Sequence, residues 1–360
     1  MQIDFHHTVT YIAARAAGFD HSEADIVAYC AQYVDDAVKD GTVTFQNRAL
    51  YARQCSAHKT ADYRNMEALA NHRVWIPFHF LPGNDGKNWQ DNPDQEFVKK
   101  VICRKNSPVA RDMITACIRD REKPFGLHRL GITMHVYADT WAHRDFAGIN
   151  HEINDISDLT DTAGTGLEPQ NMLSRFFGGF FDKAASKLVG DAFPLGHGAA
   201  LCFPDLPYLT WRYKNRDGTI VDRDNTEDFL EAADAMCQAM QQYRNQAVTA
   251  APAGMPGDYR DTVKNLFQTF DDEDGEERHG RWLAAIRDGV FPFGSERLSY
   301  DAYGKNSWKK KALGTSKDSS AYPWNKSFLI SDWKAFHDAL LDHRFTILHD
   351  ILPRYGICAA

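Results

Sequence analysis

Apolar residues recur at three- and four-residue steps along most of the chain, which is the spacing of one face of an α-helix. In residues 5–18 this pattern runs through Phe5, Val9 and Ile12, and Gly18 ends it. Strand-like runs are rare, since only residues 73–80 and 219–222 qualify. We therefore expect a mostly α fold, a multi-helix globular bundle with long irregular loops. The expected helices cover residues 5–18, 22–40, 46–57, 62–71, 108–120, 125–146, 170–188, 226–247, 258–269, 275–288 and 330–350.

Long connections separate these helices, at residues 82–95, 153–169, 191–225 and 296–328. The last contains a lysine run that we expect to face solvent. We find no internal repeat and no linker polar and long enough to require a second domain. The prediction is one α-helical domain over residues 1–360, in which the helices of 226–350 pack on a core formed by 1–212.

Composition narrows the class of protein. The chain has 360 residues, of which 43% are hydrophobic and 25% charged, as in ordinary globular domains. Its net charge of −8 argues against an extended nucleic-acid surface. No apolar run approaches the roughly 20 residues of a membrane helix, and the first residues do not resemble a signal peptide. With seven scattered cysteines and no CxxC unit, we expect a cytoplasmic protein; its oligomeric state stays open.

The histidines are the unusual feature, and four candidate ligands share residues 125–148. On a helix, His128 and His135 differ by only about 20° in direction, and Asp139 and His143 follow at four-residue steps. This stripe is typical of an aspartate that bridges two cations between histidines. The alternative is a set of exposed polar residues in which Asp139 and His143 form a surface pair.

Other segments offer further candidates. Two adjacent acids, Asp35 and Asp36, end an apolar helix, where the negative end of the helix dipole makes them costly unless a cation is near. Adjacent side chains diverge by about 100°, so only one of the pair at residues 6 and 7 can reach a shared site, and we favour His6. His79 lies in an apolar run and could equally be a core residue. His197 and Asp205 lie in a glycine- and proline-rich loop, which is typical of a ligand-donating segment.

The run GITMHVYADTWAHRDFAG resembles the HxxxD…H helix of the zinc-dependent phospholipase C and P1-type nuclease superfamily, whose members are all-α and cleave phosphodiesters with three zinc ions. More closely, FHHTVTYIAARAAGF with YCAQYVDDAV resembles a family of uncharacterised bacterial proteins. The superfamily resemblance implies that Asp139 bridges two metals beside His135 and that His143 and His197 serve a third. It also implies that His6 is the N-terminal-helix ligand. Asp35 or Asp36 would be the first aspartate ligand, followed by His79.

The chain departs from the superfamily at two points. The superfamily uses an amine exposed by signal cleavage as a ligand, and its third-site histidine is followed by a His–x3–Glu unit that is missing after His197. Asp205 or Glu152 would have to substitute. We therefore expect a site with two metal ions rather than three.

These residues predict a metal-dependent hydrolase of phosphate esters, most directly of phosphodiesters. Two or three Zn²⁺ ions, or Mn²⁺ or Fe²⁺, would activate a water, and Asp36 or Asp35 would accept its proton. The expected substrate is a small-molecule or lipid phosphoester. The contrasting hypothesis is a non-catalytic helical protein whose ligands hold a structural metal or bind an effector. A weaker alternative is an HD-type phosphohydrolase built on His337-Asp338 or His349-Asp350.

Overall fold

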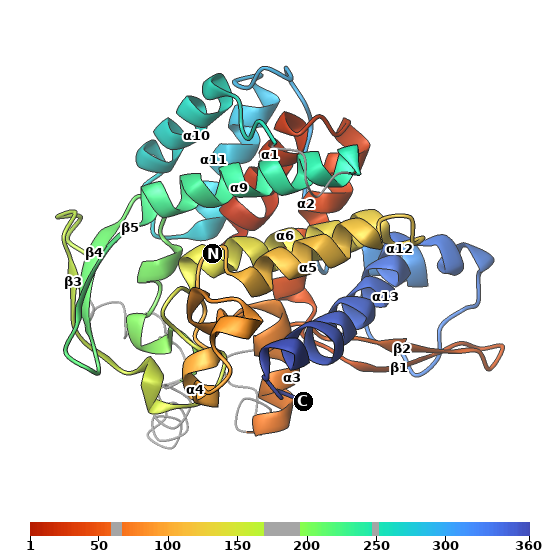
Figure 1. The fold of residues 1–360 in the computed structure, drawn as a ribbon. Coiled ribbons are helices and arrows are strands. Elements are labelled where there is room, and N and C mark those ends of the chain that lie inside the picture. The colour runs from red at the N-terminus through yellow and green to blue at the C-terminus, as the bar shows by residue number, and fades with distance from the viewer. Residues whose placement is uncertain (59–66, 169–194, 247–251) are drawn as a thin grey trace, which may run out of the picture.

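The computed structural model describes residues 1–58, 67–168, 195–246 and 252–360. Helices make up most of it (Figure 1). The α-helices are α1 (Thr10–Ala16), α2 (His21–Asp36), α3 (Ala68–Phe78), α4 (Phe97–Lys100), α5 (Pro108–Arg119), α6 (Gly126–Ala142), α9 (Asn225–Asn245), α10 (Gly257–Thr269), α11 (Gly275–Arg287), α12 (Trp308–Leu313) and α13 (Asp332–Phe345). Two π-helical stretches are η1 (Asp4–Val9) and η9 (Thr346–Ile351).

Several connections contain single 3-10 turns. These are η3 (Asn84–Gly86), η4 (Trp89–Asp91), η5 (Glu152–Asn154), η6 (Gly198–Ala200), η7 (Phe203–Asp205), η8 (Lys326–Ile330) and η10 (Leu352–Tyr355). Two of them, η6 and η7, lie in the loop that we expected to carry ligands.

Two small antiparallel sheets correct the predicted fold class. Strands β1 (Gly41–Thr44) and β2 (Leu50–Arg53) form a hairpin, and β3 (Ile156–Asp161), β4 (Thr210–Asn215) and β5 (Ile220–Asp224) form a three-stranded sheet in that order. The fold is thus helix-rich but mixed, and the expectation of a mostly α bundle was wrong. The sheets lie at opposite sides of the helical body (Figure 1).

Two segments differ from the prediction in opposite directions. Residues 46–57 do not form the predicted helix, because Arg48 adopts a positive φ of 71° and Asn47 accepts a hydrogen bond from the Ala49 amide, which together make a hairpin turn. Residues 73–78 belong to α3 rather than to a strand, and residues 79–80 follow it, since a short apolar run is compatible with either structure. The strand at 219–222 is confirmed as part of β5, and the predicted helix at 170–188 lies outside the described residues.

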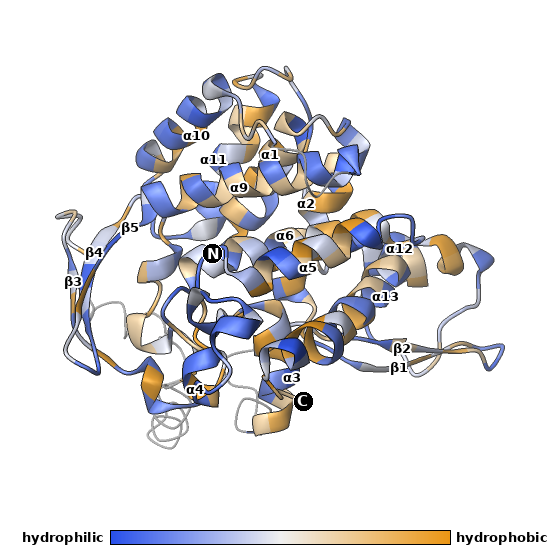
Figure 2. Cartoon of the chain, in the orientation of Figure 1, coloured by the Kyte–Doolittle hydropathy of each residue, from blue (hydrophilic) through white to orange (hydrophobic). Residues whose placement is uncertain are grey.

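The centre of the molecule is α6, which is buried over nearly its whole length and contacts α2, α5, α9 and α13. Close approach of α2 depends on Gly131, because a Cβ there would lie 2.4 Å from the Val27 carbonyl oxygen. Hydropathy follows the same arrangement, with apolar faces turned inward and charged residues outside (Figure 2). Among the described residues, no helix is both long and apolar enough to cross a bilayer. The polar side chains of α6 are therefore buried, and they need hydrogen-bonding or ionic partners inside the protein.

Candidate metal centre

Helix α6 brings three of the predicted ligands together on consecutive turns. His135 and Asp139 are 0% and 1% exposed, and His143 directly follows the last helical residue. His135 Nε2 lies 3.3 Å from Asp139 Oδ2, and His143 Nδ1 lies 3.6 Å from the same oxygen. The four-residue spacing therefore places all three groups on one face, as the sequence predicted.

Five further predicted ligands reach this place from separate segments. They are His6 in η1, Asp35 near the end of α2, His79 directly after α3, His197 before η6, and Asp205 at the end of η7. The donor atoms form three groups, in each of which they lie within 4.8 Å of one another: His6, Asp35 and His135; His79, His135 and Asp139; and His143, His197 and Asp205.

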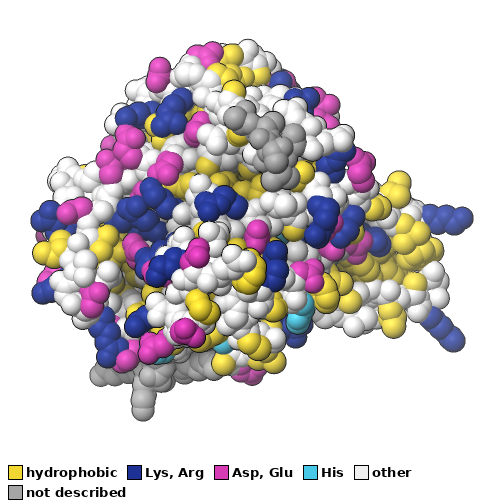
Figure 3. Space-filling model, in the orientation of Figure 1, with side chains coloured by type: hydrophobic (Ala, Val, Ile, Leu, Met, Phe, Trp, Pro, Cys, Tyr) yellow, Lys and Arg dark blue, Asp and Glu magenta, His cyan; other side chains and the backbone are white. Residues whose placement is uncertain are grey.

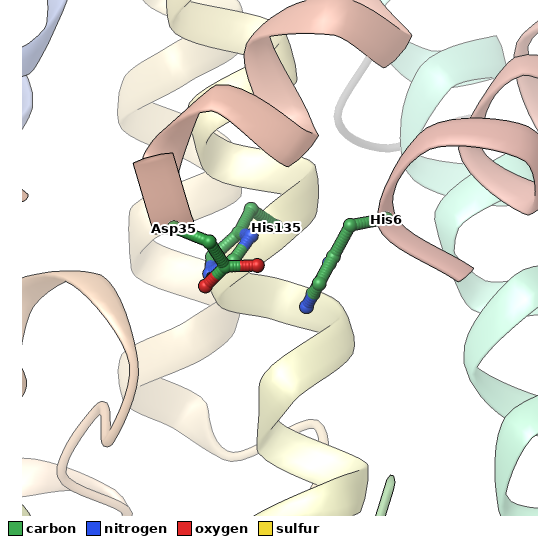
Figure 4. A group of neighbouring side chains, drawn as sticks. All are labelled: His6, Asp35 and His135. Atoms are coloured by element: carbon green, nitrogen blue, oxygen red, sulfur yellow. The ribbon is translucent and has the colours of Figure 1, made fainter. Parts of the chain in front are cut away.

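Figure 4 shows the first group, in which side chains from η1, α2 and α6 point toward one another. The rings of His6 and His135 are stacked, with their centroids 3.8 Å apart. Since His135 belongs to two of the three groups, the groups are neighbours rather than isolated sites. The structure thus contains adjoining His/Asp clusters that could hold metal ions.

Backbone carbonyls determine which nitrogen of each ring is free. His135 Nδ1 lies 2.7 Å from the Ala31 oxygen, and His79 Nε2 lies 2.9 Å from the Ser56 oxygen. His143 and His197 make the same kind of contact through Nδ1, at 2.8 Å to the His79 oxygen and 3.0 Å to the Leu201 oxygen respectively. A carbonyl can only accept, so each of these nitrogens carries the proton and the other nitrogen presents a lone pair. Metal-binding histidines are typically oriented in this way.

Two of these lone pairs face each other directly. His135 Nε2 and His79 Nδ1 are 3.2 Å apart, and neither has a proton to share if the carbonyl contacts hold theirs. Burial, together with the neighbouring His6 ring, lowers the pKa of His135 well below its ordinary value, so an extra proton is disfavoured. A metal cation is the group that would make this arrangement favourable.

The Asp139 carboxylate lies between the groups. Its Oδ1 is 3.2 Å from His6 Nε2, and its Oδ2 is 3.5 Å from His79 Nδ1. Within the described residues, Asp139 Oδ2 and both ring nitrogens of His6 make no hydrogen bond although they are buried. Unsatisfied buried polar atoms are rare and call for an explanation. Here the donor set fits divalent ions, with Asp139 able to ligate two of them.

The pKa shifts of the two aspartates also favour a cation at this place. Burial and the negative charge of Asp139 raise the pKa of Asp35 well above its ordinary value. For Asp139 burial acts in the same direction, but interactions with His143, the Met1 amine and His135 outweigh it and hold the pKa well below the usual range. Two acids so close together are stabilised by positive charge between them.

The cluster is not sealed. The side chain of Asp35 is 34% exposed, and those of His197 and Asp205 are 18% and 14% exposed, whereas Asp139 is 1% exposed. The protein's surface therefore reaches the cluster at both ends of the ligand array, while its middle is enclosed. Solvent can therefore contact the outer donors but not the carboxylate of Asp139.

Two predicted ligands lie elsewhere. Asp36 accepts hydrogen bonds from Tyr300 at 2.6 Å and from Gln32 at 3.2 Å, so it faces away from the cluster that its neighbour Asp35 joins. His128 Nε2 lies 3.1 Å from Asp332 Oδ1. The predicted angle to His135 was reasonable, but two helical turns separate the residues by about 10 Å along the axis, too far to share an ion. The structure therefore supports neither Asp36 nor His128 as a ligand.

The structure also shows where His7 and the two candidate HD dipeptides lie relative to the cluster. His7 Nδ1 lies 2.9 Å from His279 Nε2, so His6 alone of the adjacent pair enters the cluster. Of the candidate HD dipeptides, His337 Nδ1 accepts the Gln54 amide and Asp338 pairs with Lys334. His349 is exposed on η9. Neither dipeptide belongs to a His/Asp cluster within the described residues.

Sequence reasoning missed several groups that surround or orient the ligands. The Met1 backbone nitrogen lies 3.1 Å from Asp139 Oδ1 and 3.0 Å from Asp205 Oδ1. The four carbonyls that orient the imidazoles were also missed. So was Arg223, which donates to the carbonyl oxygens of Trp141 and Ala142 at 2.9 and 3.1 Å and closes the end of α6. No residue pattern marks such contacts, because they depend on the packing of distant segments.

Fold and site together define a helix-rich protein with a buried, partly open His/Asp cluster suited to metal ions. The family of unknown function DUF6765 matches residues 1–351, and the chain belongs to this family. No curated protein matches the chain. Nor does any solved structure.

Proposed function

We propose that the protein is a metal-dependent hydrolase of phosphate esters, with phosphodiesters as the first substrates to test. The observation that supports this is the convergence of unprotonated imidazole nitrogens around Asp139, which bridges donor groups that extend to the surface. Nitrogen and carboxylate donors suit Zn²⁺, and Mn²⁺ or Fe²⁺ are alternatives. The two groups that share His135 Nε2 would hold at least one ion between them, and the group of His143, His197 and Asp205 would hold another.

The ions would supply an activated water and neutralise charge on the phosphoryl oxygens. The residues of the chain hold the donors in place. The carbonyls of Ala31 and Ser56 keep His135 and His79 in the tautomers that present lone pairs. Where Asp35 does not ligate an ion, its 34% exposed carboxylate would be the group at the margin that accepts a proton from water. Asp36 is engaged with Tyr300 and is not needed for that role.

The second candidate function is a non-catalytic protein with a structural metal or a bound effector. A closed site in which protein fills every position would favour it. The exposed fractions of Asp35 and His197 favour an open position instead. We therefore place catalysis first.

The test begins with elemental analysis of protein purified without chelator and without nickel affinity. Hydrolysis of bis-p-nitrophenyl phosphate is then measured before and after chelation, and after Zn²⁺ or Mn²⁺ is returned. His135→Gln should lose bound metal and activity by at least about 100-fold, since first-sphere ligands matter more than the outer partners whose loss costs 10–100-fold. His128→Gln is the matched control, because it changes a histidine of the same helix outside the cluster.

Two outcomes would contradict the proposal. Undiminished turnover by metal-free protein would show that hydrolysis does not use the cluster. Bound metal with no hydrolysis, together with a large loss of melting temperature on chelation, would support the structural alternative.

A further inference from the structure

One end of the molecule exposes aliphatic side chains on neighbouring segments. Leu329 and Ile330 on η8 are 54% and 88% exposed, and Leu50 on the neighbouring β2 is 68% exposed, on the hairpin face opposite the Tyr51 ring that contacts Phe328. Exposed apolar residues that gather in one place are typical of interaction sites. We call the region formed by Leu329 and Ile330, together with Arg48, Lys310, Lys311 and Lys326, the hairpin-end surface.

This surface rests on a packed base. The ring of Phe45, beside the hairpin turn, lies 4.8 Å from that of Phe328 in η8. The Tyr322 amide donates to the Thr44 oxygen, and the Gln46 amide donates to the Tyr322 oxygen, both at 2.9 Å. The hairpin and residues 322–330 are thus joined by backbone hydrogen bonds and a buried aromatic contact. The exposed aliphatic side chains project from a supported structure.

Positive charge is concentrated at the same end, in a chain whose net charge is −8. Residues 305–326 contain six lysines and one acid, Asp318, which Lys39 and Lys309 already engage at 2.6 Å each. Lys310, Lys311, Lys326 and Arg48 are exposed. Figure 3 shows hydrophobic side chains at this end of the molecule, with Lys and Arg side chains projecting beyond them.

We propose that the hairpin-end surface docks on bilayers that contain anionic lipids. Lysine and arginine side chains attract the negative surface of such a membrane, and aliphatic side chains gain by entering the boundary between headgroups and acyl chains. A single-stranded nucleic acid is the weaker match, because its bases are held by stacking on aromatic rings rather than by leucine or isoleucine. The inference does not depend on the proposed hydrolase activity.

The surface is also connected to the candidate metal centre. The hydroxyl of Tyr303 donates to the backbone oxygen of Asp36 at 2.7 Å, and the ring of Tyr29, in the middle of α2, stacks on Trp308, with centroids 3.9 Å apart. The segment that carries the lysines therefore packs on α2, and the partly exposed candidate ligand Asp35 lies near the end of this helix. Docking at this end would bring the α2 end of the cluster toward the membrane.

Co-sedimentation of the full-length protein with vesicles tests the proposal. Vesicles of phosphatidylcholine alone are compared with vesicles that also contain phosphatidylglycerol, at low and high salt. The double variant Leu329→Ser/Ile330→Ser should weaken binding to anionic vesicles by roughly tenfold or more. Lys310→Gln/Lys311→Gln should weaken it by roughly thirtyfold and reduce its salt dependence. All four positions are exposed, and far-UV circular dichroism checks that the variants fold.

The matched control is Leu341→Ser/Phe345→Ser. These residues are 54% and 57% exposed but line a separate apolar hollow with Leu69, so binding should not change. Binding to anionic vesicles that both surface variants lose and the control keeps would support the proposal. The proposal fails if the wild-type protein does not bind anionic vesicles, if the control loses binding equally, or if the protein binds a single-stranded oligonucleotide but no vesicle.

Discussion

Replacing Asp139 with asparagine should destabilise the protein more with metal than without it. In the metal-free protein, the buried Asp139 Oδ2 lies 3.3 Å from the His135 lone pair and makes no hydrogen bond among the described residues. Asparagine has the same shape, and its amide group at that position would donate to the imidazole. Filling that unsatisfied contact would gain about 1–3 kcal/mol, but asparagine also loses the ion pair between Asp139 Oδ1 and the Met1 nitrogen, 3.1 Å away, and breaking a buried pair costs about 3–5 kcal/mol. The free energy of unfolding of the metal-free variant should therefore fall by about 2 kcal/mol.

With zinc present the loss is larger. If loss of the bridging carboxylate weakens binding by about 100-fold, the free energy of unfolding at fixed free zinc falls by about 2.7 kcal/mol more than it does in the metal-free protein. The assay is urea unfolding of both proteins, once with chelator and once with buffered Zn²⁺. Asp332→Asn serves as control, because Asp332 pairs with His128 outside the cluster and should respond equally under both conditions.

An equal loss of stability in both conditions would refute this reasoning. It would mean that Asp139 acts as an ordinary ion-pair partner of the Met1 amine, and that the imidazole lone pairs do not converge on an ion. A loss that is about 2.7 kcal/mol larger with zinc than without it is the result that the geometry requires.

Three further predictions concern the scaffold. Arg223→Gln should lower the free energy of unfolding by about 3 kcal/mol, because it leaves Asp228 with one fewer buried partner and uncaps α6; denaturant titration measures this. Gly131→Ala should cost about 1–3 kcal/mol and lower the metal content, since its Cβ would clash with the Val27 oxygen. Burial lowers the pKa of His337 to about 3 from 6.5, so its contribution to stability is complete above pH 6.5 and is lost as the pH falls toward 3. His337→Gln should therefore flatten the pH dependence of unfolding over that interval, and an unchanged slope would contradict it.

Much of the candidate site was accessible from residue spacing. His135, Asp139 and His143 are four residues apart, and helix geometry alone places them on one face. The same reasoning failed for His128, because periodicity describes direction around the helix and says nothing about whether the axial distance suits one ion. It also could not decide between Asp35 and Asp36, since Tyr300, far along the chain, occupies the second of them.

The secondary structure was likewise predictable from the sequence in some segments and not in others. Long amphipathic stretches such as α9 and α10 were predicted close to their observed bounds, because many residues contribute to one pattern. Short apolar segments were not. Residues 73–80 resemble a strand in isolation, and residues 46–57 a helix, until the packing of α3 and the turn at Arg48 are seen.

What the sequence determined by itself is the donor chemistry and its local order: which imidazoles and carboxylates exist, and which of them follow one another on a helix. The tertiary structure decided which donors meet and in which protonation form. It did so through the carbonyls of Ala31, Ser56 and Leu201, each supplied by a segment remote from the ring that it orients or by the turn that encloses it. The physical reason is that a neutral imidazole offers a lone pair only on the nitrogen that carries no proton. A backbone carbonyl fixes the proton on the other nitrogen, and that contact exists only after the chain has folded.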